Sequence, residues 1–128
     1  MVRILVVDDN PDIRTFLVLL FQRAGHDAIE VADSTTVLTW VEDTDPDVII
    51  LDVTMPGMDA WETLAMLKSD PMSKDIPVII SSAPGDYEHL DRARALGAAD
   101  YILKPWTAAD ILTRVLWAAT ARPDLGES

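Results

Sequence analysis

Acidic, hydroxyl and basic side chains follow four short apolar runs of this chain, at the point where each run ends. Asp8 and Asp9 follow the first run, Asp52 the second, Ser82 the third and Lys104 the fourth. If these runs are neighbouring parallel strands, their carboxyl ends share one edge of the sheet, where open α/β sheets bind ligands. Three carboxylates, a hydroxyl and an ammonium group at one edge suit phosphoryl transfer assisted by a divalent metal.

The apolar runs have the length and composition of buried strands. They are short, rich in valine and isoleucine, and bounded by turn residues, which is typical of a parallel sheet covered on both faces. The four runs cover residues 4–7, 48–51, 78–80 and 101–103. A further strand is predicted at 27–31, and no chemically active side chain follows it.

Segments with helical spacing separate the strands. Pro11 after Asn10 is typical of a helix start, and Gly25 of a helix end. The expected core face of this first helix consists of Ile13, Phe16, Leu17, Leu20 and Ala24. Four more helices are predicted at about 34–43, 60–69, 86–96 and 107–121. Strands that alternate with helices in this way indicate an α/β fold, with a parallel sheet between two layers of helices.

Composition limits the classes of function. A chain of 128 residues fits one domain, and 22 acidic against 10 basic residues give a net charge of −12. Such a surface repels nucleic acid and anionic lipid, so we expect no direct binding of nucleic acid and no membrane association. There is no cysteine and no apolar stretch of the ~20 residues that a membrane span needs. Met1-Val2-Arg3 leads directly into the first predicted strand, so we expect no cleavable signal peptide. We therefore expect a cytoplasmic protein.

As a set, these residues resemble the receiver domains of two-component response regulators, the CheY-like family. The matching residues are Asp8-Asp9, Asp52 within the segment 51–59, Ser82 before Ala83, and Lys104-Pro105. The resemblance covers about residues 2–118. It implies a doubly wound, flavodoxin-like sheet of five parallel strands in the order 2-1-3-4-5 with five helices. The receiver domain would occupy residues 1–122, followed by a short polar tail at 123–128.

The resemblance also implies a phosphoacceptor site. Asp52 would receive a phosphoryl group from a histidine of a sensor kinase or of a histidine phosphotransfer protein. Mg²⁺ would be held by Asp8, Asp9, Asp52 and the backbone carbonyl of Thr54. Lys104 and Ser82 would contact the phosphoryl oxygens. The domain would assist its own phosphorylation and dephosphorylation without being a turnover enzyme.

Signal output in this family is a shift between two conformations. Ser82 and Tyr101 stand at the positions of the expected switch residues, and a downstream protein target or effector domain would read the change. Helical spacing places Trp117 on the outer side of the last helix, where a phosphorylation-dependent homodimer or a partner would bind. Val18 and Leu19 are predicted on the outer side of the first helix, as a kinase-docking patch. The isomer of the Lys104-Pro105 bond is left open.

Other interpretations compete with this one. A Mg²⁺-dependent small-molecule phosphohydrolase also uses an aspartate nucleophile, but its Asp-x-Asp pattern is absent because Asn10 follows Asp8-Asp9. A flavin or dinucleotide binder would need a Gly- or Thr-rich phosphate loop after a strand. In a purely structural interpretation, Asp8 and Asp9 cap the first helix. His26 and His89 are expected to be surface residues without a function.

Overall fold

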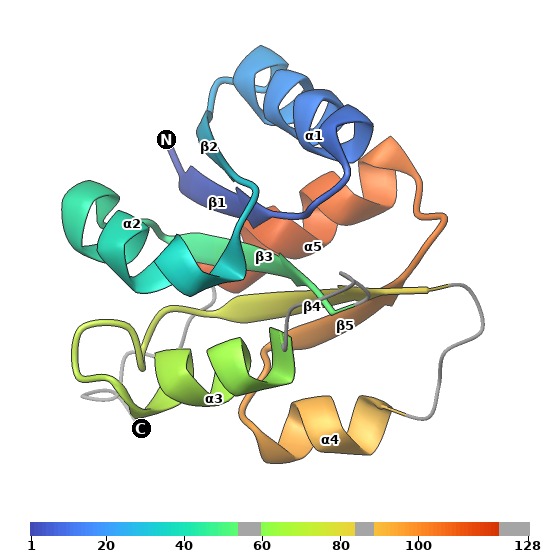
Figure 1. The fold of residues 1–128 in the computed structure, drawn as a ribbon. Helices are drawn as coiled ribbons and strands as arrows, with labels where there is room; N and C mark the ends of the chain where they lie inside the picture. Colours follow the sequence, from blue (N-terminus) through green and yellow to red (C-terminus); the bar gives the residue numbers. More distant parts are fainter. Residues whose placement is uncertain (54–59, 84–88, 121–128) are drawn as a thin grey trace.

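Five parallel strands form one sheet in the part of the chain that the structure describes (Figure 1). The computed structural model describes residues 1–53, 60–83 and 89–120. The strands are β1 (Arg3–Val7), β2 (Asp27–Val31), β3 (Val48–Asp52), β4 (Val78–Ser82) and β5 (Asp100–Leu103). Their order in the sheet is β2-β1-β3-β4-β5. The predicted fold class and strand order are thus confirmed.

Helices cover both faces of the sheet. On one face lie α1 (Pro11–Arg23) and α5 (Ala108–Thr120). On the other face lie α2 (Val37–Thr44), α3 (Ala60–Ser69) and α4 (Leu90–Ala95). Within the described residues, no helix has both the length and the apolar character needed to cross a bilayer.

The sheet supplies the centre of two apolar cores, because successive strand side chains point to opposite faces. Leu5, Leu51 and Ile80 contact the layer of α2, α3 and α4. Ile4 and Ile79 contact the layer of α1 and α5. Burying each of these side chains stabilises the fold by about 1.5–3 kcal/mol. All residues of β3 and β4, and residues 4–7 of β1, are buried, so the centre of the sheet is a rigid support for the residues at its edge.

The strand register aligns the carboxyl ends that carry the polar residues. Val7 of β1 pairs with Leu51 of β3, so the residues that follow them are neighbours. Asp52 pairs with Ser81 of β4, and Ser82 pairs with Leu103 of β5. This register gathers the ends of β1, β3, β4 and β5 at one edge of the sheet, as the sequence predicted.

The core face of α1 differs from the prediction, because Phe16 and Ala24 are exposed and Phe21 is buried. Leu17 and Phe21 are its fully buried residues, whereas Phe16 is 47% exposed. Phe16 instead stacks on Trp106, with 5.9 Å between the ring centroids and 25° between the planes. Val18, predicted on the outer side, packs against the core, whereas Leu19 is exposed as predicted. The buried stripe is therefore centred on Leu17 and Phe21.

The second helical segment begins with a 3₁₀ turn, Ser34–Thr36, rather than with α-helix. Asp33 caps this turn, and its carboxylate accepts hydrogen bonds from the backbone N–H and the hydroxyl of Thr35, at 2.9 and 2.7 Å. The same two hydrogen bonds lower the pKa of Asp33. At the other end, Asp45 ends α2 in the left-handed region, with φ at 48°.

The predicted ends of the last two helices fall partly outside the described residues. The fourth helix, predicted at 86–96, is observed as Leu90–Ala95, and residues 84–88 are not described. The fifth, predicted at 107–121, is observed as Ala108–Thr120. The predicted tail at 123–128 also lies outside the described residues.

Both histidines are less exposed than expected. His26 is half-buried, and its Nδ1 accepts a hydrogen bond from the backbone N–H of Val2 at 3.0 Å. His89 is half-buried beside the Trp61 ring, with 5.4 Å between the ring centroids. Each histidine therefore makes a tertiary contact that the sequence did not predict.

Candidate functional site

Three carboxylates meet where β1 and β3 end. Asp8 and Asp9 follow β1, Asp52 ends β3, and one carboxylate oxygen of each lies within 4.8 Å of those of the other two. Asp8 and Asp52 are 3% and 2% exposed, whereas Asp9 is exposed. The site therefore has two buried carboxylates at its base and a third at its mouth.

Lys104 completes the cluster from the end of β5. Its Nζ lies 3.2 Å from Oδ2 of Asp52 and 3.3 Å from Oδ2 of Asp8, and its side chain is largely buried. The backbone N–H of Lys104 donates to the carbonyl of Ser82 at 2.9 Å, which fixes the start of the following segment. The Lys104-Pro105 peptide bond is cis. The ammonium group thus lies between the two buried carboxylates.

The loop after β1 holds Asp8 at several atoms. Its backbone N–H donates to the carbonyl of Val31 at 3.2 Å, and its Oδ1 accepts from the backbone N–H of Asn10 at 2.9 Å. Oδ1 of Asn10 in turn accepts from the N–H of Asp12 at 2.9 Å and caps α1. Asn10, and not Asp8 or Asp9, is therefore the helix cap, which removes the purely structural interpretation of the acidic pair.

Burial raises the pKa of Asp8 to about 6, and the neighbouring carboxylate of Asp52 adds to this rise. The hydrogen bond from Asn10 and the charge of Lys104 oppose it. One ammonium group therefore does not balance the carboxylates gathered here. A divalent cation would remove this penalty, because it favours the charged form of every carboxylate around it.

The sequence matches the response regulator receiver domain family over residues 4–116. The chain belongs to this family. Among curated relatives, the receiver domain is 33% identical to the phosphate regulon transcriptional regulatory protein PhoB of Pseudomonas aeruginosa, over 98% of this chain and 54% of that protein. It is 31% identical to the DNA-binding response regulator MtrA of Mycolicibacterium smegmatis, over 88% of this chain and 48% of MtrA. The chain thus spans about half the length of these relatives.

Solved structures agree with this assignment. The receiver domain of the Francisella response regulator 1452 has a TM-score of 0.85 at 28% identity, over 96% of this chain and all of that one. The chemotaxis protein CheY4 of Vibrio cholerae has a TM-score of 0.81 at 29% identity, over 90% of this chain and 98% of that one. These likenesses favour a receiver domain over the phosphohydrolase alternative.

The two expected switch residues of the receiver domain lie on neighbouring strands. Ser82 is fully buried at the end of β4. Tyr101 of β5 is half-buried and packs against the core on the side of α4. The switch role of Ser82 and Tyr101 stays a prediction. Thr54, the predicted source of a carbonyl ligand, lies outside the described residues.

Arg14 is a site residue that sequence reasoning missed. Its Nη1 donates to the main-chain oxygen of Asp8 at 2.6 Å. A basic residue one turn into the helix that follows an acidic pair is a weak sequence signal, because most such residues extend into solvent. A contact with a backbone atom leaves no pattern of residue types that would identify it.

Proposed function

We propose that this receiver domain accepts a phosphoryl group on Asp52 from a phosphohistidine, in a Mg²⁺-dependent reaction. The observation that carries the proposal is the position of Asp52. Its carboxylate is buried at the end of the central strand, 3.2 Å from Lys104 and beside two further carboxylates. The donor would be a sensor histidine kinase or a histidine phosphotransfer protein, since receiver domains of response regulators interact with histidine kinases.

Asp8, Asp9 and Asp52 would hold the metal, because carboxylate oxygens are the ligands that Mg²⁺ prefers. The carbonyl of Thr54 is the further ligand expected from the family. When bound, the ion supplies positive charge at the phosphoryl oxygens. An oxygen of Asp52 forms the new bond to phosphorus as the bond from phosphorus to the donor nitrogen breaks.

Lys104 and Ser82 would stabilise the phosphoryl group in this scheme. The ammonium group of Lys104 already lies between Asp8 and Asp52, so it is placed to neutralise an oxygen of a group attached to Asp52. The hydroxyl of Ser82 would donate to another oxygen. Drawing Ser82 toward the phosphoryl group would shift the populations of two conformations, which is signalling rather than substrate turnover.

Labelling by a small phosphodonor tests the assignment of Asp52. With Mg²⁺ and acetyl phosphate, the wild-type chain is expected to gain one phosphoryl group by intact-mass spectrometry, and Asp52→Asn none, because the nucleophilic oxygen is lost. Asp12→Asn, an exposed acidic residue in the first turn of α1, is the matched control and should label like wild type. Equal labelling of wild type and Asp52→Asn would exclude Asp52 as the acceptor.

The phosphodonor would dock on an apolar surface that we term the α1 patch, formed by Phe16, Leu19 and Trp106. Phe16 and Leu19 are each 47% exposed on α1, and Phe16 stacks on Trp106 of the segment between β5 and α5. Trp106 follows Lys104 by two residues, so this surface borders the carboxylate cluster. An amphipathic helix that carries the donor histidine fits such a surface.

Comparison of two donors tests this surface. Phe16→Ala should slow phosphorylation by a kinase that labels the wild-type chain about tenfold, because truncating an interface aromatic costs more than about 1 kcal/mol. Labelling by acetyl phosphate should not change. Trp40→Ala, another partly exposed aromatic residue but on α2, serves as control. Slowing of both donors alike would show that Phe16 supports the fold and not docking.

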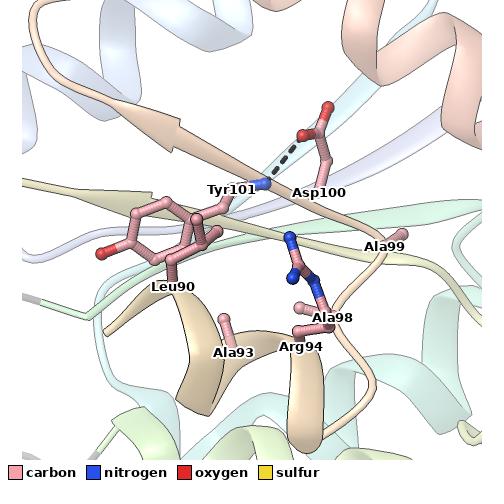
Figure 2. Close-up of a pocket in the computed structure, with 7 residues that line it drawn as sticks. All are labelled: Leu90, Ala93, Arg94, Ala98, Ala99, Asp100 and Tyr101. Carbon is pink, nitrogen blue, oxygen red and sulfur yellow. Dashed lines mark hydrogen bonds between the residues drawn. The ribbon is translucent and has the colours of Figure 1, made fainter. Parts of the chain in front are cut away.

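The output surface would comprise α4, β5 and α5. Between α4 and β5 lies a pocket of about 180 Å³, lined by residues that include Arg94 and Tyr101 (Figure 2). Because Tyr101 lies in its wall, movement of this side chain would change the shape of the pocket. A downstream protein target, an effector domain or a second copy would bind here in the cytoplasm, without direct contact to nucleic acid or membrane.

A further inference from the structure

Arg14 turns back from α1 toward the acidic loop instead of extending into solvent. Its Nη1 donates to the main-chain oxygen of Asp8 at 2.6 Å, and its Nε donates to the carboxylate of Glu30 on β2 at 3.3 Å. The Arg14 side chain is only 15% exposed, whereas that of Glu30 is 46% exposed. Arg14 therefore lies largely buried between the loop and the edge strand of the sheet.

With this contact, all four polar atoms of Asp8 have a partner. Its N–H donates to Val31, its carbonyl accepts from Arg14, Oδ1 accepts from the N–H of Asn10, and Oδ2 lies near Lys104. The contact with Arg14 differs from that with Lys104. Lys104 contacts carboxylate oxygens, which a metal would also need, whereas Arg14 occupies only a backbone oxygen.

The position of Arg14 has a consequence for the cluster. Its guanidinium group fixes the peptide between Asp8 and Asp9, because the oxygen it contacts belongs to that peptide. Asp9 is the exposed carboxylate of the site, so the direction of this peptide determines where Asp9 points.

We propose that Arg14 is a positioning residue for the metal site, which holds Asp8 and Asp9 in the arrangement that binds a divalent cation. The proposal rests on the Mg²⁺-dependent function proposed above. Without the guanidinium group, the peptide between Asp8 and Asp9 is free to rotate, and cation binding must order it. Replacing Arg14 should therefore weaken Mg²⁺ binding without changing the rate of phosphorylation at saturating Mg²⁺.

Titration of the unphosphorylated chain with Mg²⁺ by calorimetry tests this role. Arg14→Met is expected to weaken Mg²⁺ binding about tenfold, which corresponds to about 1.4 kcal/mol. Arg14→Lys should recover part of the loss, because an ammonium group can still donate to the carbonyl. Glu30→Gln is the matched control and should stay within about twofold of wild type, since an amide oxygen can still accept from Nε of Arg14.

The acetyl phosphate reaction separates positioning from chemistry. At low Mg²⁺, Arg14→Met should react about tenfold more slowly than wild type, and at saturating Mg²⁺ within about twofold of it. An Mg²⁺ affinity within twofold of wild type would overturn the proposal, and so would equal slowing at low and saturating Mg²⁺. If circular dichroism shows that Arg14→Met is unfolded, Arg14→Lys becomes the test. The proposal then requires Arg14→Lys to bind Mg²⁺ at least about threefold more weakly than wild type. If Asp52→Asn is labelled, Asp52 is not the phosphoacceptor. The role of Arg14 is not affected by that result, because the Mg²⁺ titration uses the unphosphorylated chain.

Discussion

Asp8 is a buried side chain of this site whose charge is costly. Burial, with the help of Asp52, raises its pKa from the ordinary 3.8 to about 6. A carboxyl group that binds its proton more tightly in the folded than in the unfolded state stabilises the fold at low pH. This contribution is complete below the ordinary pKa and is lost as pH rises through about 6. At neutral pH the charged Asp8 therefore lowers the stability of the metal-free protein, and the proposed metal binding needs this charge.

The variant Asp8→Asn is expected to stabilise the metal-free protein at pH 7.5 by about 1–3 kcal/mol, because the amide carries no charge that must be buried. The gain should shrink as pH falls below about 6, where Asp8 itself becomes protonated. Urea unfolding at several pH values measures it. The same variant should bind Mg²⁺ more weakly, since a carboxylate ligand is lost.

Asp12→Asn is the control for this pH dependence, because Asp12 is exposed and lies outside the cluster. It should alter neither the Mg²⁺ affinity nor the slope of stability against pH between 4 and 7. A loss of stability in Asp8→Asn at pH 7.5, or a gain that does not depend on pH, would show that burial does not strain the Asp8 carboxylate.

At the scale of elements, local patterns predicted the strands and the helix positions, whereas features that depend on a neighbour were missed. Phe16 and Phe21 both fit a helical stripe, and only the position of Trp106 decides that Phe16 is exposed and stacked. The left-handed Asp45 was missed because glycine is the usual signal for that conformation. A contact between α3 and α4 was also missed, because it depends on how two helices pack. In it, Arg92 lies over the Trp61 ring, with Cζ 4.9 Å from the centroid.

The contact between Arg92 and Trp61 should stabilise the packing of α4. This helix has six residues, of which only Ala93 is buried, so the ring contact adds to a small buried surface. Arg92→Gln is expected to lower the free energy of unfolding by about 0.5–1 kcal/mol, the usual size of a cation–π interaction. In a Trp61→Leu background the same change should have almost no effect. Urea unfolding of the four proteins gives the coupling energy.

Arg94→Gln is the matched control for this cycle, since Arg94 makes no ring contact among the described residues and lies on the same helix. It should change the stability by less than about 0.5 kcal/mol. If Arg92→Gln has the same effect with and without the Trp61 ring, the guanidinium group contributes through some other neighbour.

At the scale of the whole molecule, the candidate site could be predicted because parallel topology forces the carboxyl ends of the strands to one edge. Asp8, Asp9, Asp52 and Lys104 meet there as the residue types and strand ends predicted. What remained out of reach depends on tertiary geometry. The hold of Arg14 on a backbone oxygen is one example, and the cap supplied by Asn10 in place of the acidic pair is another.

Trp117 is the side chain by which we expect the molecule to report phosphorylation to a second copy. It is 68% exposed on α5, opposite the face that Ile111 and Val115 bury, as the helical spacing predicted. Nearby on the same helix, Arg114 is held by Asp100 and Asp110 at 3.0 and 3.2 Å, which raises its pKa, so the surface beside Trp117 is partly ordered by ion pairs. Tryptophan and arginine are among the residues most enriched in interface hot spots.

Sedimentation velocity with Mg²⁺ and beryllofluoride, which imitates the phosphoryl group, is expected to show self-association of the wild-type receiver domain. Trp117→Ala should weaken it at least about tenfold, as the loss of a tryptophan hot spot does. Trp40→Ala is the matched control because Trp40 is also partly exposed but lies on α2, on the opposite layer of the sheet. If wild type and Trp117→Ala both remain monomers with beryllofluoride, and a protein partner binds both equally, Trp117 is a surface residue and the output signal leaves the domain elsewhere.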